Sequence, residues 1–283
     1  MTNSTHNTRQ IKRIVEPHYV REGAGVRLRR TIALPQLDQV DPFLLLDDFR
    51  ADNPADVLAG FPMHPHRGIE TVTYILTGNV NHRDSIGNAG TIGPGDVQWM
   101  TAGRGILHEE MPQPVDGKLE GFQLWVNLPA ALKMAPARYQ EVKSAQIPEV
   151  EVDGVTVRVI AGSIDGVTGA VTEIAAQPTY LDVTMSAHSS FVHALPEAHA
   201  AFVYLFEGEI AIGGKTVSAT RLILLDKGQE ISIKTNERDA RFLLVAGKPL
   251  HEPIARHGPF VMNTQEEIRQ TLKELRAGTF PPP

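Results

Sequence analysis

TVTYILTGNV, residues 71–80, is a short run of β-branched and apolar residues that ends at a Gly-Asn turn. Runs of this kind, bounded by turn residues, are typical of β-strands. Comparable runs recur along the chain at 122–128 (FQLWVNL), 155–160 (VTVRVI), 201–206 (AFVYLF), 222–225 and 242–245. Because no helical segments alternate with these runs, the pattern predicts an all-β sandwich or barrel and not a doubly wound α/β sheet.

The same run also belongs to a weak internal repeat. YILTGNV at 74–80 resembles YLFEGEI at 204–210, 130 positions later, and Gly95-Asp-Val has a counterpart in Gly228-Gln-Glu-Ile, 133 positions later. Two matches at nearly the same offset predict two copies of one β unit. We place the first unit at residues 10–130, an Ala- and Pro-rich linker at 131–150 and the second unit at 151–283.

One helix is predicted, at residues 263–277 within the second unit. Asn263 can cap it and Glu266 follows three residues later, as in a capping box. Ile268, Leu272 and Leu275 recur at helical spacing, so one apolar stripe should dock on a β domain.

Composition excludes several classes of function. The 283 residues carry 27 Lys+Arg against 33 Asp+Glu, a net charge of −6, which argues against direct nucleic-acid binding. With no cysteine there are no disulfides, thiolate metal sites or cysteine nucleophile. No apolar run approaches the ~18 residues of a membrane span, and no stretch resembles a signal peptide. We therefore expect a soluble, cytoplasmic protein.

The strongest chemical signal is HPHRGIE at residues 64–70. Alternate residues of a strand share a face, so His64 and His66 should point the same way and Glu70 could follow them. A pair of histidines at this spacing is by itself more often a surface or packing pair than a ligand pair.

A second cluster, GRGILHEE at residues 103–110, makes a metal-binding role for these histidines more plausible. By the same alternation His108 and Glu110 share one face while Glu109 points away. Both motifs on neighbouring strands would gather three imidazoles and a carboxylate around one point. Such a set suits iron, nickel, copper, zinc or manganese, and leaves two octahedral positions open. Periodicity alone leaves the metal and packing interpretations both open.

Several stretches carry a family resemblance. HPHRGIETVTYI (64–75), PGDVQWMTAGRGILHEEMP (94–112) and LWVNLP (124–129) closely resemble the pirin family of the cupin superfamily. The segments at 27–49 (RLRRTIALPQLDQVDPFLLLDDF) and 247–268 (GKPLHEPIARHGPFVMNTQEEI) are also similar to pirins. The resemblance runs from about residue 10 to 277. It implies a bicupin, two antiparallel β-barrels of the jelly-roll type, with metal in the N-terminal barrel.

The resemblance also implies a ligand set. By motif, the metal ligands are His64, His66, His108 and Glu110, holding one divalent metal per chain. Fe²⁺ is favoured, with Zn, Mn, Ni, Cu and Co as alternatives. General cupins take their carboxylate from the first motif, where Glu70 stands; we follow the pirin pattern and expect Glu70 to orient a ligand by hydrogen bonding.

The second copy lacks the equivalent motifs. His193 and His199 form no H-x-H pair, and residues 228–245 contain no histidine. We therefore expect a C-terminal barrel that is metal-free and structural. His251 and His257 lie beyond the repeat and are interpreted as structural.

Other residues near the motifs are open to two interpretations. Gln123 could face the metal pocket. Arg67 and Arg104 could hold an acidic substrate, although pairing with surface carboxylates is favoured. The large side chains close to the motifs are expected in the core, with the cavity mouth as the alternative: Trp99, Met100, Phe122 and Trp125.

The resemblance implies two functions of different classes. Bacterial pirins resemble quercetin 2,3-dioxygenases, which open the flavonol heterocycle with O₂ and release carbon monoxide. The predicted partners are then a flavonol-like small molecule and O₂, with Glu110 as the general base. The alternative is a non-catalytic regulatory protein, responsive to redox state or metal, that acts through a protein partner.

Overall fold

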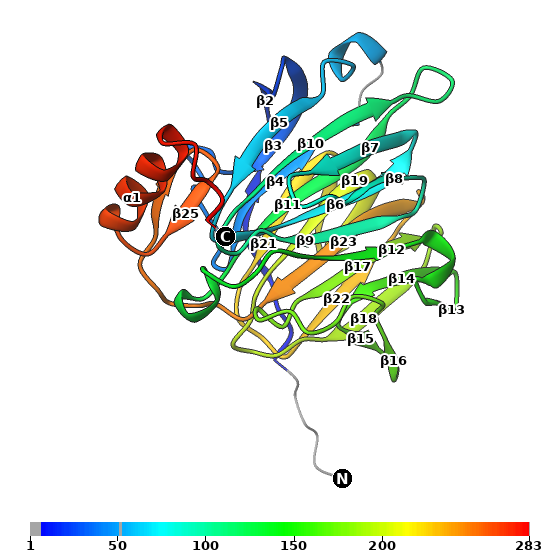
Figure 1. Ribbon diagram of the computed structural model, residues 1–283. Coiled ribbons are helices and arrows are strands. Elements are labelled where there is room, and N and C mark those ends of the chain that lie inside the picture. The colour runs from blue at the N-terminus through cyan, green and yellow to red at the C-terminus, as the bar shows by residue number, and fades with distance from the viewer. Residues whose placement is uncertain (1–6, 51–52, 283) are drawn as a thin grey trace. The chain divides into compact units, whose positions relative to one another are not determined.

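The computed structural model describes residues 7–50 and 53–282, which form antiparallel β-sheets and one α-helix (Figure 1). The chain divides into two compact units. The first unit comprises residues 18–144 and the chain from 250 onward; the second comprises the chain up to residue 17 and residues 145–249. Among the described residues, no helix has the length and apolar character needed to span a membrane.

The first unit contains a seven-stranded and a four-stranded sheet. The seven-stranded order is β12 (Arg138–Val142), β9 (Val97–Thr101), β6 (Ile69–Thr77), β11 (Glu120–Asn127), β4 (Phe43–Asp48), β3 (Val26–Ile32) and β2 (His18–Glu22). The four-stranded order is β5 (Phe61–His66), β10 (Ile106–Gln113), β7 (Asn79–Asp84) and β8 (Ala89–Ile92). A further pair joins β24 (Ala255–His257) to β25 (Phe260–Met262).

The second unit repeats this plan in one ten-stranded sheet. Its main path is β1 (Ile11–Val15), β21 (Arg221–Leu225), β19 (Ala200–Ile212), β23 (Ala240–Gly247), β17 (Thr179–Met185), β14 (Val155–Ala161) and β13 (Glu149–Val152). Off this path, β18 (Ser190–Ala194) pairs with β22 (Glu230–Lys234), which pairs with β19, and β19 pairs with β20 (Lys215–Ser218). A small hairpin joins β15 (Ser163–Ile164) to β16 (Val167–Thr168).

The two strand orders correspond position by position, which confirms the predicted duplication. β6 of the first unit matches β19 of the second, and the glycine that follows the matching run has a left-handed backbone in both, at Gly78 (φ +79°) and Gly208 (φ +73°). A residue with a Cβ is strained in that conformation, so both positions favour glycine. The sheets do not close on themselves, so each unit is an open jelly roll.

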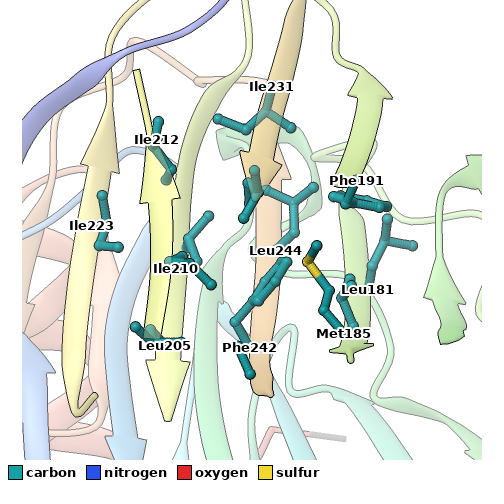
Figure 2. Packing of buried hydrophobic residues seen from close by; sticks show 14 of the residues in the cluster. Leu181, Met185, Phe191, Leu205, Ile210, Ile212, Ile223, Ile231, Phe242 and Leu244 are labelled. Atoms are coloured by element: carbon teal, nitrogen blue, oxygen red, sulfur yellow. The ribbon is translucent and has the colours of Figure 1, made fainter. Parts of the chain in front are cut away.

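The interior of the second unit is filled by apolar side chains. Figure 2 shows residues of β17, β18, β19, β21, β22 and β23 directed toward one another, among them Phe191, Ile231 and Phe242, all at most 4% exposed. β-Branched and aromatic residues of this kind pack well on a pleated surface, so the cluster stabilises the unit by burial.

The helix α1 (Gln265–Arg276) departs from two predictions. It begins one residue later than expected: Thr264 is the N-cap, and its hydroxyl accepts from the Glu267 backbone N–H in a full capping box. The helix also belongs to the first unit and not to a C-terminal unit at 151–283. It packs against β24 and β25, and Figure 1 shows it beside β25. The sequence motif for a helix is local and carries no information about which unit receives its apolar stripe.

Arg67 explains this placement. Its guanidinium is buried and donates to the Arg104 carbonyl at 2.7 Å, to the Thr271 hydroxyl at 2.8 Å and to Glu274 Oε2 at 2.6 Å. The next residue, Gly68, has φ +76°, and a Cβ there would lie 1.9 Å from the Val261 carbonyl oxygen. These contacts attach the segment from residue 250 to residue 282 directly to the HPHRG motif. Arg67 is paired with a carboxylate, as favoured from the sequence, but its guanidinium is buried and not at the surface as expected.

Replacing Arg67 by methionine should lower the free energy of unfolding by about 3 kcal/mol, because buried acceptors lose their charged donor. Urea denaturation of the full chain measures this loss. Arg269→Met, on the helix that Arg67 contacts, is the control: its pair with Glu266 is exposed, so the change should stay below about 0.5 kcal/mol. Equal shifts in the two variants would refute the anchoring role of Arg67.

Candidate metal centre

Three histidines from two paired strands meet in the first unit. On β5, His64 and His66 are two residues apart, and the antiparallel register with β10 sets His108 opposite His64. One ring nitrogen from each histidine lies within 4.8 Å of those of the other two. The ring centroids are 4.9 Å (His64–His66), 4.4 Å (His64–His108) and 5.0 Å (His66–His108) apart. The sequence prediction that these side chains converge is confirmed.

The nitrogen atoms of this cluster are arranged as metal ligands would be. His64 Nδ1 lies 3.0 Å from the Pro62 carbonyl oxygen, a contact that fixes the ring with Nε2 on the side of the other histidines. That Nε2 is 3.0 Å from His66 Nε2. Both ring nitrogens of His108 are buried without a hydrogen-bond partner among the described residues. Buried imidazole nitrogens normally have partners, so the donor set fits a divalent metal.

Burial also sets the protonation state of the cluster. Desolvation, reinforced by His64, lowers the pKa of His108 to about 3. Desolvation, with His108 and His64 next in importance, places the pKa of His66 well below its usual value. The two imidazoles are therefore neutral near pH 7, which is the form that binds metals.

Glu110 lies beside the histidine cluster but is not part of the group within 4.8 Å. Its side chain lines the same cavity as His64 and His66 and is buried. Thr73 Oγ1 donates to Glu110 Oε1 at 2.9 Å and also lies 2.8 Å from Gln123 Oε1. This places the carboxylate in the cavity with a fixed orientation, while its role as a metal ligand stays a prediction.

Glu109 points to the other side of β10. Its carboxylate pairs with Arg83, which lies opposite it on β7, and the Arg83 side chain is 66% exposed. Strand alternation therefore separates the two neighbouring carboxylates as the sequence predicts.

The expectation for Glu70 is wrong. β5 and β6 belong to different sheets, and the left-handed backbone of Gly68 interrupts the strand between them. The alternation of side chains therefore does not continue from His66 to Glu70. On β6, Glu70 faces the side opposite to Thr73, and its Oε1 accepts from the Thr101 hydroxyl at 2.8 Å. Burial raises the pKa of this carboxyl group.

A cavity of about 570 Å³ opens beside the cluster. Gln123 and Trp125 line it, which agrees with the pocket interpretation of Gln123. Trp99, Met100 and Phe122 are at most 1% exposed and belong to the core. Most of the cavity wall is apolar, from residues of four strands and two loops: Val26, Leu28, Leu45, Phe49, Val57, Phe61, Val80 and Leu119.

One polar group near the cluster was missed from the sequence. His82 lies opposite Glu110 on β7, is 4% exposed, and its Nε2 is 3.0 Å from Glu141 Oε1. Its ring stacks on Tyr139 with centroids 6.2 Å apart. The sequence NHRD at 81–84 contains this histidine, but its relation to Glu110 depends on the register between β7 and β10, which the sequence alone does not give.

The second unit differs at the matching strand pair. Where β5 and β10 set His64 opposite His108, β18 and β22 set His193 opposite Ile231. His193 and His199 are both buried, so they pack inside the unit and are not surface residues. A metal-free second unit stays a prediction, supported by this replacement of imidazole by an apolar side chain.

Comparisons with known proteins agree with this plan. The Pirin family model matches residues 25–126, and the model of the Pirin C-terminal cupin domain matches residues 180–281. The structure of quercetin 2,3-dioxygenase from Acinetobacter baumannii is 35% identical, with a TM-score of 0.87 over 96% of this chain and 98% of that one. The bacterial pirin YhhW from Escherichia coli, solved with nickel(II), shares the fold at 21% identity and a TM-score of 0.66, covering 84% and 98%.

Sequence relatives are closer still. A Pseudomonas aeruginosa protein that is provisionally named a quercetin 2,3-dioxygenase is 47% identical over 271 residues, 93% of this chain and 95% of that protein. Human pirin is 43% identical over 262 residues, 90% and 88% of the two chains. Two jelly-roll units, with one histidine cluster found among the described residues, define a bicupin protein. The chain belongs to the pirin family.

Proposed function

We propose that this protein is an iron(II)-dependent dioxygenase that opens the heterocyclic ring of flavonols such as quercetin with O₂, releasing carbon monoxide. The observation that carries the proposal is the convergence of His64, His66 and His108 at a largely apolar cavity of about 570 Å³. That volume lies in the range of small-molecule sites, roughly 300–1,000 Å³. The similarity to the Acinetobacter baumannii quercetin 2,3-dioxygenase supports the same choice.

A divalent metal held by the three histidines would act as a Lewis acid, favouring the ionised form of a flavonol hydroxyl. The protein's own contribution begins with Glu110, which can accept the hydroxyl proton because its carboxylate faces the cavity. Thr73 holds this carboxylate through its 2.9 Å hydrogen bond, so the base is oriented before the substrate arrives. A carboxylate that bound the metal tightly would be a weaker base; the position of Glu110 outside the 4.8 Å group favours the base role.

The cavity wall favours a planar aromatic ligand. Leu28, Phe61 and Leu119 line one cavity together with the ring of Trp125. Burying apolar rings against such side chains contributes roughly 25 cal/mol per Å² of surface removed from water.

The deciding test is oxygen uptake with quercetin by the iron-loaded protein under air. We expect flavonol absorbance to fall in step with O₂ consumption and carbon monoxide release. The metal-free protein should show only the uncatalysed rate. Stable iron binding without any oxygen uptake, across several flavonols, would contradict the proposal and favour the regulatory alternative.

A further inference from the structure

Arg256 is a cation in the wall of the cavity, close to the histidine cluster. It lies on β24 and its guanidinium carbon stands 5.1 Å from the Trp125 ring. The same ring meets His66 edge-on, with centroids 5.1 Å apart at 87°. A ligand that lies along Trp125 can therefore reach both the histidine cluster and Arg256.

Arg256 has no carboxylate partner within the part of the chain that the structure describes. Its hydrogen bonds are long and go to carbonyl oxygens, of Gly258 at 3.3 Å and of Leu44 at 3.4 Å. Arg30, in the same cavity wall, is paired with Asp47 at 2.7 and 2.8 Å and with Glu22 at 2.6 Å. Three carboxylates act on Arg256 electrostatically, Asp38 most and then Asp47 and Glu22, but none forms an ion pair with it among the described residues. Asp47 and Glu22 already bind the Arg30 guanidinium.

The positive charge of Arg256 is therefore not neutralised by an ion pair within the described residues. An arginine stays protonated in proteins, and a guanidinium in a partly desolvated wall is stabilised by a planar, bidentate anion. Desolvation, followed by repulsion from Arg30, lowers the pKa of Arg256, although Asp38, Asp47 and Glu22 act in the opposite direction. The neighbouring Trp125 face compensates in part through a cation–π contact.

We propose that Arg256 binds a carboxylate on the substrate, so that the preferred ligand is a planar aromatic hydroxy-ketone bearing an acidic substituent on the ring that lies against Trp125. The proposal rests on the function proposed above and specifies its substrate class. Arg67, which the sequence also offered as an acid-binding residue, is unavailable because Glu274 holds it. Arg30, the other arginine of the wall, is already paired with Asp47 and Glu22, which leaves Arg256 as the arginine open to a carboxylate.

The test compares two ligands that differ in one group: 3-hydroxyflavone and the same compound with a carboxylate on its phenyl ring, at the 3′ or the 4′ position. Dissociation constants are measured by fluorescence titration of the iron-loaded protein without oxygen. The wild type should bind a carboxylate isomer about tenfold more tightly than the neutral compound, as expected for one charge-assisted hydrogen-bonded pair. In Arg256→Met the ratio should fall to near one, and Arg256→Lys should recover part of it.

Arg269→Met removes an exposed arginine of α1 and should keep the wild-type ratio. A wild type without preference for the carboxylate, a preference that survives in Arg256→Met, or no binding of either compound would each overturn the inference. The binding assay contains no O₂, so it is independent of turnover. Arginine-dependent carboxylate binding without oxygen uptake would refute the dioxygenase activity and support the proposed ligand class. Turnover without a preference for the carboxylate would support the dioxygenase activity and refute the proposed ligand class.

Discussion

Replacing His64 and His108 together by alanine should reduce bound iron from one equivalent per chain to nearly none. Each histidine offers a ring nitrogen to the same point, so the double variant leaves His66 as the sole imidazole. Loss of a residue that merely hydrogen-bonds a ligand already costs roughly 10–100-fold in metal affinity, and loss of two ligands must cost more. Metal analysis after iron loading and desalting measures the stoichiometry.

The second unit provides the matched control. His193→Ala with His199→Ala also removes two buried histidines, one of them at the matching strand pair, where Ile231 stands opposite. This variant should keep a full equivalent of iron. Retention of iron in the His64/His108 variant, or loss of iron in the control, would show that the metal is held elsewhere.

Glu110→Gln should lower flavonol turnover by about 100-fold or more, because loss of a general base typically has this effect. Glu109→Gln provides a control with the same chemistry one residue away. Its carboxylate faces Arg83 on the outer side of the strand, so turnover should be nearly unchanged and stability should change by less than about 0.5 kcal/mol. Steady-state turnover and bound iron are measured side by side.

The combined readout separates the two roles proposed for Glu110. If iron falls together with turnover, Glu110 is a ligand; if iron stays and turnover falls, it is a base. Equal behaviour of the two variants would contradict the assignment of Glu110 to the cavity.

The strands and the histidine cluster could be predicted because their signals are local. Alternation over two residues fixes His64 with His66 and His108 with Glu110, and turn residues mark where strands end. Glu70 was misassigned because a left-handed glycine at Gly68 interrupts the alternation, and one residue of irregular backbone is enough to reverse a face.

Features that depend on long-range pairing were not predictable. His82 became relevant only through its register with Glu110, and Arg256 only through its approach to Trp125, 131 positions away in the sequence. The placement of α1 also depends on a long-range contact, because Glu274 on this helix binds Arg67, which lies 207 positions earlier. Predictions that the chain is cytoplasmic or binds a protein partner depend on no contact described in the structure and stay predictions.

The bond between Arg67 and Glu274 has a consequence for how the protein is made. The ribosome delivers the two residues 207 positions apart, which at about 5–20 residues per second takes roughly 10 to 40 s. During that interval the histidine-bearing unit lacks β24, β25 and α1, while the whole of the second jelly roll emerges. Nascent chains halted before residue 250 should therefore expose the HPHRG segment to proteases, and the order of maturation should run from the second unit to the first, against the direction of synthesis.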